Sequence, residues 1–128
     1  MLSDSSLSFL KRLLDTPGPS SFESAPARVW RAEAAQFAAV SADVVGNSFA
    51  AVEGQGGPTI LLAGHIDEIG IIVTWIDENG FVYFEPIGGW DPQVLVAQRI
   101  RFLGRNGDVF GVIGKKPIHL MKPDEREK

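Results

Sequence analysis

Residues 59–68 read Thr-Ile-Leu-Leu-Ala-Gly-His-Ile-Asp-Glu, and this stretch decides the expected fold. Its first half is apolar almost throughout. A strand buried on both faces has this composition, and such strands usually lie in the middle of a parallel sheet. His65 follows the strand directly. Because ligands of open α/β sheets bind beyond the carboxyl ends of the strands, the sequence predicts a functional position at His65.

Asp67 lies two residues after His65, and in an extended segment two such side chains point the same way. A carboxylate beside a metal-ligating His accepts its second ring N–H, fixes the tautomer and raises the basicity of the ring. His65 is therefore a candidate metal ligand, and Asp67 is the candidate catalytic carboxylate that supports it. The motif is short, so the alternative is a structural His at a strand end with a carboxylate partner.

The other motifs give weaker evidence for a functional site. His119, the second of two histidines, follows the last expected strand and is expected in a solvent-exposed loop. Two histidines with scattered carboxylates do not make a visible zinc site. The loop 88–92 could bind a ligand through Trp90, but a tight turn with the Trp packed back is the favoured interpretation.

Helical patterns precede the 59–68 stretch. Leu7, Leu10, Leu13 and Leu14 recur at helical spacing after Ser3 or Asp4 as a cap, and residues 16–19 (Thr-Pro-Gly-Pro) must end this helix. A second helix should begin between residues 20 and 24, with Ser24 as the preferred cap because Pro26 is tolerated only in a first turn. A strand at 43–45, a turn at 46–47 and a strand at 48–52 should follow.

All signals after residue 69 are those of strands. We expect strands at 70–75, 81–85, 98–103 and 109–113, with turns at 77–80, 86–92 and 105–108. Short strands joined by Gly and Asn turns are typical of a small barrel or sandwich. The predicted class is thus α/β, with the opening of an α/β sheet domain over residues 1–68 and a small barrel or sandwich over residues 69–128.

The composition excludes several classes of protein. Twelve Lys and Arg against sixteen Asp and Glu give a net charge of −4, which argues against nucleic acid as the main partner. The absence of cysteine excludes disulfides and thiolate sites and fits a cytoplasmic protein. No apolar run approaches the roughly 20 residues of a membrane span, so no membrane partner is expected.

Taken in order, the motifs resemble those of the metal-dependent aminopeptidases that include glutamyl, deblocking and tetrahedral (TET) aminopeptidases, some of them labelled cellulase or endoglucanase. The resemblance covers nearly the whole chain. It is carried by residues 16–23, 45–47, 62–70, 88–92, 98–99 and 111–119. Each piece alone is weak, but the order and spacing together are specific.

This resemblance implies a zinc-peptidase-like α/β fold with two co-catalytic divalent metals, zinc or cobalt. It also implies peptide substrates, from which residues are removed at the free N-terminus, and assembly into homo-oligomers through the inserted barrel-like domain. His65 matches the first metal ligand of the family, and Asp67 matches the carboxylate that supports it.

The resemblance covers only the N-terminal portion of the family. The bridging Asp, the general-base Glu, the remaining metal ligands and the second ligand His have no counterpart in these 128 residues. A two-metal hydrolase needs several ligands and a base to activate water, so the chain alone is expected to be inactive. The main hypothesis is a portion of an aminopeptidase. The alternative is a non-enzymatic remnant that acts as a self-association or binding module.

A glycoside hydrolase needs a pair of facing carboxylates, and the adjacent Asp67 and Glu68 would face opposite ways on a strand, so this class is disfavoured.

The strands of residues 42–64 would expose an edge if the rest of the sheet were missing, and exposed edges pair with other chains. The isolated chain is therefore expected to oligomerise or aggregate.

Overall fold

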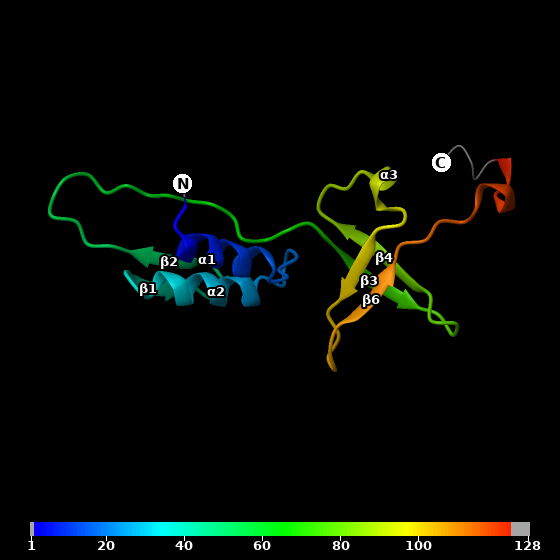
Figure 1. The fold of residues 1–128 in the computed structure, drawn as a ribbon, viewed down its shortest axis with the longest axis horizontal. Coiled ribbons are helices and arrows are strands. Elements are labelled where there is room, and N and C mark those ends of the chain that lie inside the picture. The colour runs from blue at the N-terminus through cyan, green and yellow to red at the C-terminus, as the bar shows by residue number, and fades with distance from the viewer. Residues whose placement is uncertain (1, 124–128) are drawn as a thin grey trace. The chain divides into compact units, whose positions relative to one another are not determined.

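The computed structural model describes residues 2–123, which form helices and antiparallel strand pairs in two compact units (Figure 1). The first unit ends at Gly89 and the second begins at Trp90. The predicted domain boundary between residues 68 and 69 stays a prediction. No helix within residues 2–123 is long and apolar enough to cross a membrane.

The first helix, α1, spans Asp4–Leu14 as expected. Ser3 is its N-cap, and the Ser3 hydroxyl accepts a hydrogen bond from the Ser6 amide at 3.2 Å. The capping oxygen satisfies one of the amide groups that have no partner within the first turn. Arg12 of α1 contacts Glu33 of the next helix at 2.6 Å, which joins the two helices at the surface.

The second helix, α2, spans Ser24–Ala34, and its N-cap is Glu23 rather than the predicted Ser24. The first helical hydrogen bond runs from the Ala27 amide to the Glu23 carbonyl at 2.9 Å. Pro26 therefore occupies the last position of the first turn, where a missing N–H costs nothing. The prediction was wrong by one residue because proline is accepted at any of these first positions. Pro26, Ala27 and Ala34 are the buried residues of α2.

A hairpin of β1 (Ala39–Ala42) and β2 (Ser48–Ala51) packs beside α2. The strand expected at residues 43–45 is a turn instead, and the strand lies just before it. The Asp43 carboxylate accepts hydrogen bonds from the amides of Val45, Gly46 and Asn47 at 2.9–3.0 Å. An Asp side chain that caps the backbone in this way competes with strand pairing, which explains the correction.

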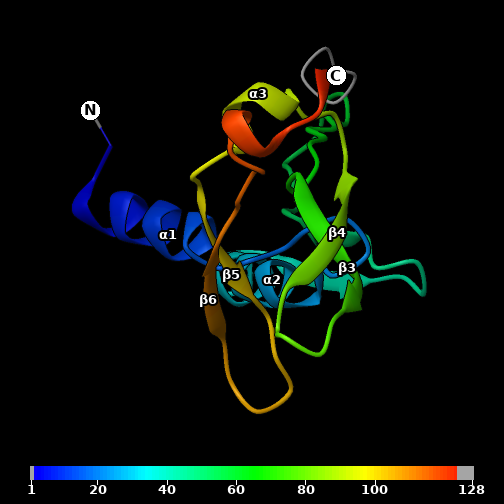
Figure 2. The same ribbon diagram turned by 90° about the vertical axis from the view of Figure 1, so that its right-hand side faces the viewer.

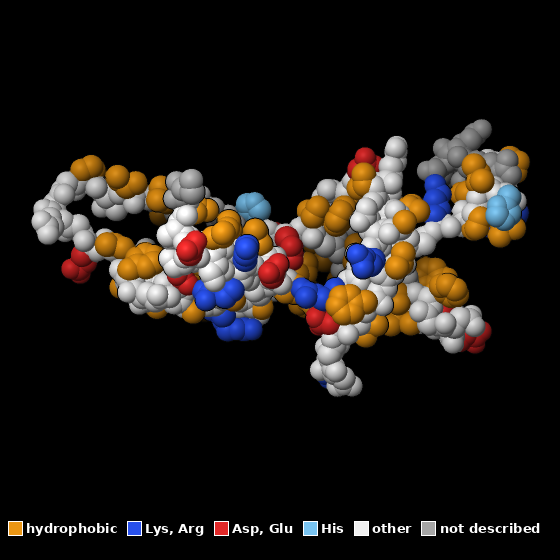
Figure 3. All heavy atoms as spheres, in the orientation of Figure 1, with side chains coloured by type: hydrophobic (Ala, Val, Ile, Leu, Met, Phe, Trp, Pro, Cys, Tyr) orange, Lys and Arg blue, Asp and Glu red, His pale blue; other side chains and the backbone are white. Residues whose placement is uncertain are grey.

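Residues 52–69 connect β2 to β3 with no helix or strand, so the predicted buried strand at 59–64 is not formed (Figure 1). Leu61 and Leu62 are 83% and 91% exposed. An apolar segment of this kind forms a strand when neighbouring strands pair with it and bury its side chains. Within residues 2–123 no strand pairs with this segment. Figure 3 shows how much hydrophobic side-chain surface the described residues leave open.

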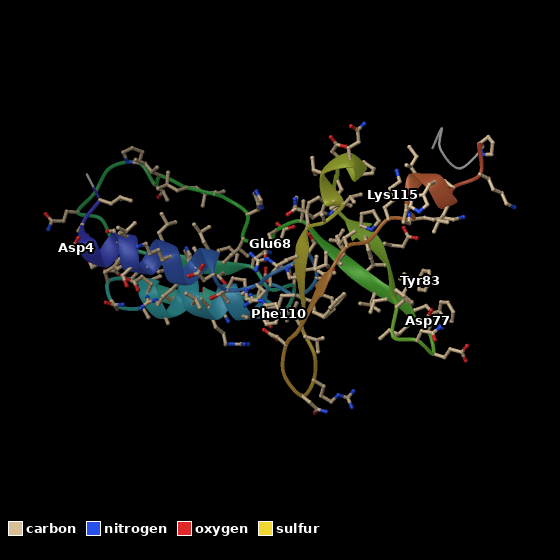
Figure 4. All side chains as sticks on the ribbon, turned by 45° about the vertical axis from the view of Figure 1, so that its right-hand side comes forward. Asp4, Glu68, Asp77, Tyr83, Phe110 and Lys115 are labelled. Carbon is tan, nitrogen blue, oxygen red and sulfur yellow. The ribbon has the colours of Figure 1, made fainter. Side chains whose placement is uncertain are left out.

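The second hairpin pairs β3 (Gly70–Ile76) with β4 (Val82–Ile87), in agreement with the two expected strands. Asp77, labelled with Tyr83 in Figure 4, begins the connecting turn. The rings of Trp75 and Tyr83 stack with centroids 5.0 Å apart. The predicted turn at 86–92 begins later than expected, because Pro86 still pairs within β4. Each strand of this two-stranded sheet is an edge, where proline is tolerated.

The unit that begins at Trp90 contains the short helix α3 (Pro92–Leu95), the hairpin of β5 (Arg99–Phe102) and β6 (Val109–Val112), and the 3₁₀ helix η1 (Ile118–Leu120) (Figure 2). The strand predictions at 98–103 and 109–113 are confirmed. In residues 2–123 every sheet has two strands, so a closed barrel is not formed by the described part of the chain. His119 lies exposed in η1 instead of a loop.

Candidate functional site

The site lies where the segment after α1 (residues 18–20) contacts the segment before β3 (residues 65–69). Pro19 and Glu68 form a parallel bridge, with the Glu68 amide donating to the Gly18 carbonyl at 2.9 Å and the Ser20 amide donating to the Glu68 carbonyl at 3.3 Å. The Glu68 side chain adds a third bond, since Oε1 accepts from the Gly18 amide at 2.9 Å. Glu68, labelled in Figure 4, therefore holds residues 18–20 through its backbone and its side chain.

Two glycines permit close approaches at this site. A Cβ on Gly70 would lie 2.8 Å from the Cβ of Pro19, and a Cβ on Gly18 would collide with Cγ of Pro26 in α2. Contacts this short are not accommodated without movement of the backbone or the ring. Gly70 therefore allows the residue before Ser20 to lie against the start of β3, and Gly18 allows the same segment to pack against α2.

His65 and Asp67 lie on one side of the extended segment, as their spacing predicts. Nδ1 of His65 is 2.9 Å from Oδ1 of Asp67 and 3.1 Å from the Asp67 carbonyl oxygen. Such an arrangement leaves Nε2 as the outward nitrogen of the ring. The structure therefore brings the two candidate residues together, while their roles in catalysis stay a prediction.

Ser20 completes a chain of three side chains. Its hydroxyl donates to Oδ2 of Asp67 at 2.5 Å. This bond, and after it the bond from His65, lowers the pKa of the Asp67 carboxyl. An ionised carboxylate only accepts hydrogen bonds, so Nδ1 of His65 must be the donor, and Nε2 of the neutral ring keeps its lone pair.

Sequence reasoning missed Ser20 because it lies 47 residues from Asp67. Its only signal in the sequence is its place in residues 16–23, where a capping role was expected. A capping box accounts for residues 20–23 by their place at the start of α2. It therefore gives no reason to expect a contact between this segment and residues 67–70.

The site is open to solvent, with the side chain of His65 87% exposed and that of Asp67 37% exposed. Histidine side chains stand at the surface in Figure 3. Among residues 2–123 no group of three or more His, Cys, Asp or Glu side chains is placed to hold a metal ion. The described residues therefore fit one ligand with its supporting carboxylate, not a complete metal centre.

Neither the adjacent carboxyl nor a hollow beside the β1–β2 hairpin offers a second site. Glu68 bonds to the Gly18 amide while Asp67 bonds to Ser20 and His65, so the two carboxyls do not face a common point. A hollow of ≈ 510 Å³ is lined by residues 35–39 and 51–53, with Glu53 as its one ionisable side chain. That hollow includes none of the residues of the His65 site.

Comparison with known protein families identifies the family of this chain. Residues 46–128 match the model of the M42 glutamyl aminopeptidase family. The chain belongs to this family. The segment that carries His65, Asp67 and Glu68 lies inside the matched residues, whereas Ser20 lies before them.

Individual members of the family give the same result. The lysyl aminopeptidase of Pyrococcus furiosus is 36% identical over 115 residues, which cover 88% of this chain and 33% of that protein. The crystal structure of a TET aminopeptidase from the marine sediment archaeon Thaumarchaeota archaeon SCGC AB-539-E09 matches with a TM-score of 0.89 and 38% identity, over 98% of this chain and 36% of that one. These matches confirm the predicted α/β class.

A third match concerns assembly. The TET1 peptidase of Pyrococcus horikoshii, which can assemble into a tetrahedron or a large octahedral shell, matches with a TM-score of 0.76 and 32% identity, over 89% of this chain and 34% of that one. The chain thus spans about one third of the length of the relatives that it matches.

Proposed function

We propose that this chain supplies part of a metal-dependent aminopeptidase, in which His65 is a metal ligand and Asp67 holds it in position. The observation that supports the proposal best is the bond between Nδ1 of His65 and the ionised Asp67 carboxylate, which presents Nε2 outward in a ligating form. Family membership supports the reaction class, and the geometry of His65 and Asp67 supports the proposed roles.

The donor set fits one position of a two-metal site. Histidine nitrogen suits zinc and cobalt, and a carboxylate on the other ring nitrogen is the common support for such a ligand. When bound, two divalent ions polarise a scissile carbonyl and lower the pKa of a water. In this proposal the chain itself contributes the orientation of His65. The further ligands and the general base belong to the two thirds of the relatives' length that the chain does not span.

The substrates and surroundings follow from the same proposal. A peptide with a free N-terminus is the proposed substrate, since the relatives are named for the removal of lysyl and glutamyl residues. Assembly into homo-oligomers is proposed from the particles formed by the relative from Pyrococcus horikoshii. We place the protein in the cytoplasm, which agrees with the absence of cysteine.

Hydrolysis of chromogenic lysyl and glutamyl anilides tests the proposal, with the protein taken in its intact form from its own cells. We expect activity that disappears on treatment with a chelator and returns with zinc or cobalt. N-acetylated substrates should be resistant. His65→Ala should lower kcat/KM by at least about 100-fold, since it removes a ligand of an ion that contributes several kcal/mol to the transition state.

His119→Ala is the matched control, because it removes the other histidine, which is also exposed. Its activity should remain within about twofold of the wild type, as expected for the substitution of an exposed side chain that has no part in the proposed site. Activity that survives the chelator, or that is equal in His65→Ala and the wild type, would contradict the proposal. The recombinant 128-residue chain by itself is expected to be inactive, for lack of the remaining ligands.

A non-enzymatic module is the second candidate function. It is favoured by the lack of a three-ligand cluster among the described residues and by the exposed apolar segment at 59–64. Self-association that is unchanged by a chelator, together with the absence of aminopeptidase activity in the intact natural protein, would support this alternative over the enzyme.

A further inference from the structure

We propose that Ser20 is a positioning residue that sets the tautomer of His65 through Asp67. The inference rests on the proposed function, since its purpose is to keep Nε2 of His65 ready for a metal. Its physical content is a chain of two hydrogen bonds, from the Ser20 hydroxyl to Oδ2 of Asp67 and from Nδ1 of His65 to Oδ1.

Asp67 needs such a partner because its carboxylate can turn. Rotation about the Cβ–Cγ bond of Asp is broad, and burial does not restrain a side chain that is 37% exposed. The Ser20 hydroxyl binds one oxygen at 2.5 Å and thereby leaves the other oxygen directed at His65. Without Ser20, water would compete for both oxygens, and the bond to His65 would be occupied for a smaller part of the time.

Ser20 is itself held firmly. Its amide donates to the Glu68 carbonyl, and the preceding residue bridges Glu68. Gly18 adds a bond from its amide to the Glu68 carboxyl at 2.9 Å. The Ser20 hydroxyl therefore lies on a segment whose backbone is hydrogen-bonded to Glu68, the residue next to Asp67. Docking of residues 18–20 and orientation of His65 are coupled in this arrangement.

The tautomer of His65 is the direct readout, and it needs neither metal nor activity. We would record ¹⁵N spectra of the histidine rings in the metal-free 128-residue chain, in dilute solution at neutral pH. In the wild type Nδ1 should carry the proton. In Ser20→Ala the shifts of Nδ1 and Nε2 should move toward the Nε2–H form. Ser20→Thr, which keeps the hydroxyl, should restore the wild-type shifts, and His119 should not respond in any variant.

Ser41→Ala is the matched control, since Ser41 is an exposed serine of β1 with no described side-chain hydrogen bond. Amide spectra of all variants show whether the fold is retained. If Ser20→Ala keeps the amide pattern and leaves the His65 tautomer unchanged, the inference is wrong. It is also wrong if Ser20→Thr fails to rescue while remaining folded, because a loss of packing would then explain the effect.

A zinc or cobalt titration of the same samples separates the inference from the proposed function. We expect the metal-induced shift of His65 to require up to about tenfold more metal in Ser20→Ala, the lower end of the range for loss of a supporting partner. If wild-type His65 does not respond to metal although Ser20 controls its tautomer, the positioning role stands and the metal role of His65 fails. If His65 binds metal with equal affinity in both proteins, the positioning role fails and the metal role stands.

Discussion

At the scale of single residues, order at this site depends on hydrogen bonds and close backbone contacts, since burial supplies little of it. His65 is largely exposed, yet both the ring and its carboxylate have defined partners. The Asp67 carboxylate is ionised at neutral pH, and the bonds from Ser20 and His65 lower its pKa further. An ionised carboxylate only accepts hydrogen bonds, so Ser20 and His65 are the donors. A small set of contacts between residues 18–20 and 67–70 therefore determines which ring nitrogen faces outward.

Gly70→Ala tests whether this close contact matters. The new methyl group would meet the Cβ of Pro19 at 2.8 Å and push residues 18–20 away from Glu68. We expect a loss of stability of roughly 1–3 kcal/mol, typical of overpacking, together with the same shift of the His65 tautomer as in Ser20→Ala. Denaturant unfolding and the ¹⁵N ring spectra measure the two effects.

Gly89→Ala is the control for this substitution, because nothing lies within 4 Å of a Cβ at that position. It should change stability by less than about 0.5 kcal/mol and leave His65 unaffected. Equal unfolding curves for Gly70→Ala and Gly89→Ala would show that the contact between Pro19 and Gly70 is looser than the structure describes.

At the scale of elements, the β1–β2 hairpin depends on one carboxylate. The side chain of Asn47, and to a lesser degree the amides of the turn, lower the pKa of Asp43 below its ordinary value of 3.8. A group with a lowered folded-state pKa contributes stability that is fully present above its unfolded value, near 4. That contribution is lost as the pH falls through the folded value. We expect the amide shifts of residues 45–47 to change below pH 4 and to be constant from pH 5 to 8.

Asp43→Asn provides the comparison for this pH dependence, because it removes the charge and keeps the size of the side chain. Its turn amides should no longer titrate, and the hairpin should lose protection at neutral pH. Asp15→Asn is the control, since no side-chain hydrogen bond of Asp15 is described. If residues 45–47 titrate in the same way in Asp43→Asn and in the wild type, another group controls the turn.

The elements that the sequence predicts well are those whose causes lie within a few residues. The spacing of Leu7 to Leu14 and the cap at Ser3 place α1, and the Asp77 turn places the β3–β4 hairpin. Strand β1 was misplaced because Val44 and Val45 have strand propensity while the Asp43 side chain bonds their backbone. Likewise the His65–Asp67 pair follows from local spacing. Its link to Ser20 depends on a long-range contact that no periodicity reveals.

At the scale of the whole molecule, the segment at 59–64 stands out because it is apolar and yet exposed to solvent. Ile60, Leu61 and Leu62 are all at least 79% exposed, and among residues 2–123 the only buried apolar side chains are Pro26, Ala27, Ala34 and Ile113. An extended apolar segment with unpaired backbone groups is a template for pairing with another chain. Within a protein of the relatives' length, we expect strands from the remaining two thirds to cover it.

For the 128-residue chain alone, the same reasoning predicts self-association through this segment. Leu61→Lys should weaken it, because a charged side chain cannot be buried between paired strands without a partner. Burial of one leucine is worth about 1.5–3 kcal/mol, so the dissociation constant should rise by roughly tenfold or more. Light scattering over a concentration series measures the change.

Val44→Lys separates a specific strand contact from non-specific hydrophobic association, since Val44 is fully exposed but lies in the Asp43 turn. It should leave the dissociation constant nearly unchanged. Equal effects of the two substitutions would mean that any exposed apolar group drives association. A monomeric wild-type chain at high concentration would show that residues 59–64 need no partner, and would thereby remove the structural argument that this segment belongs inside a larger sheet.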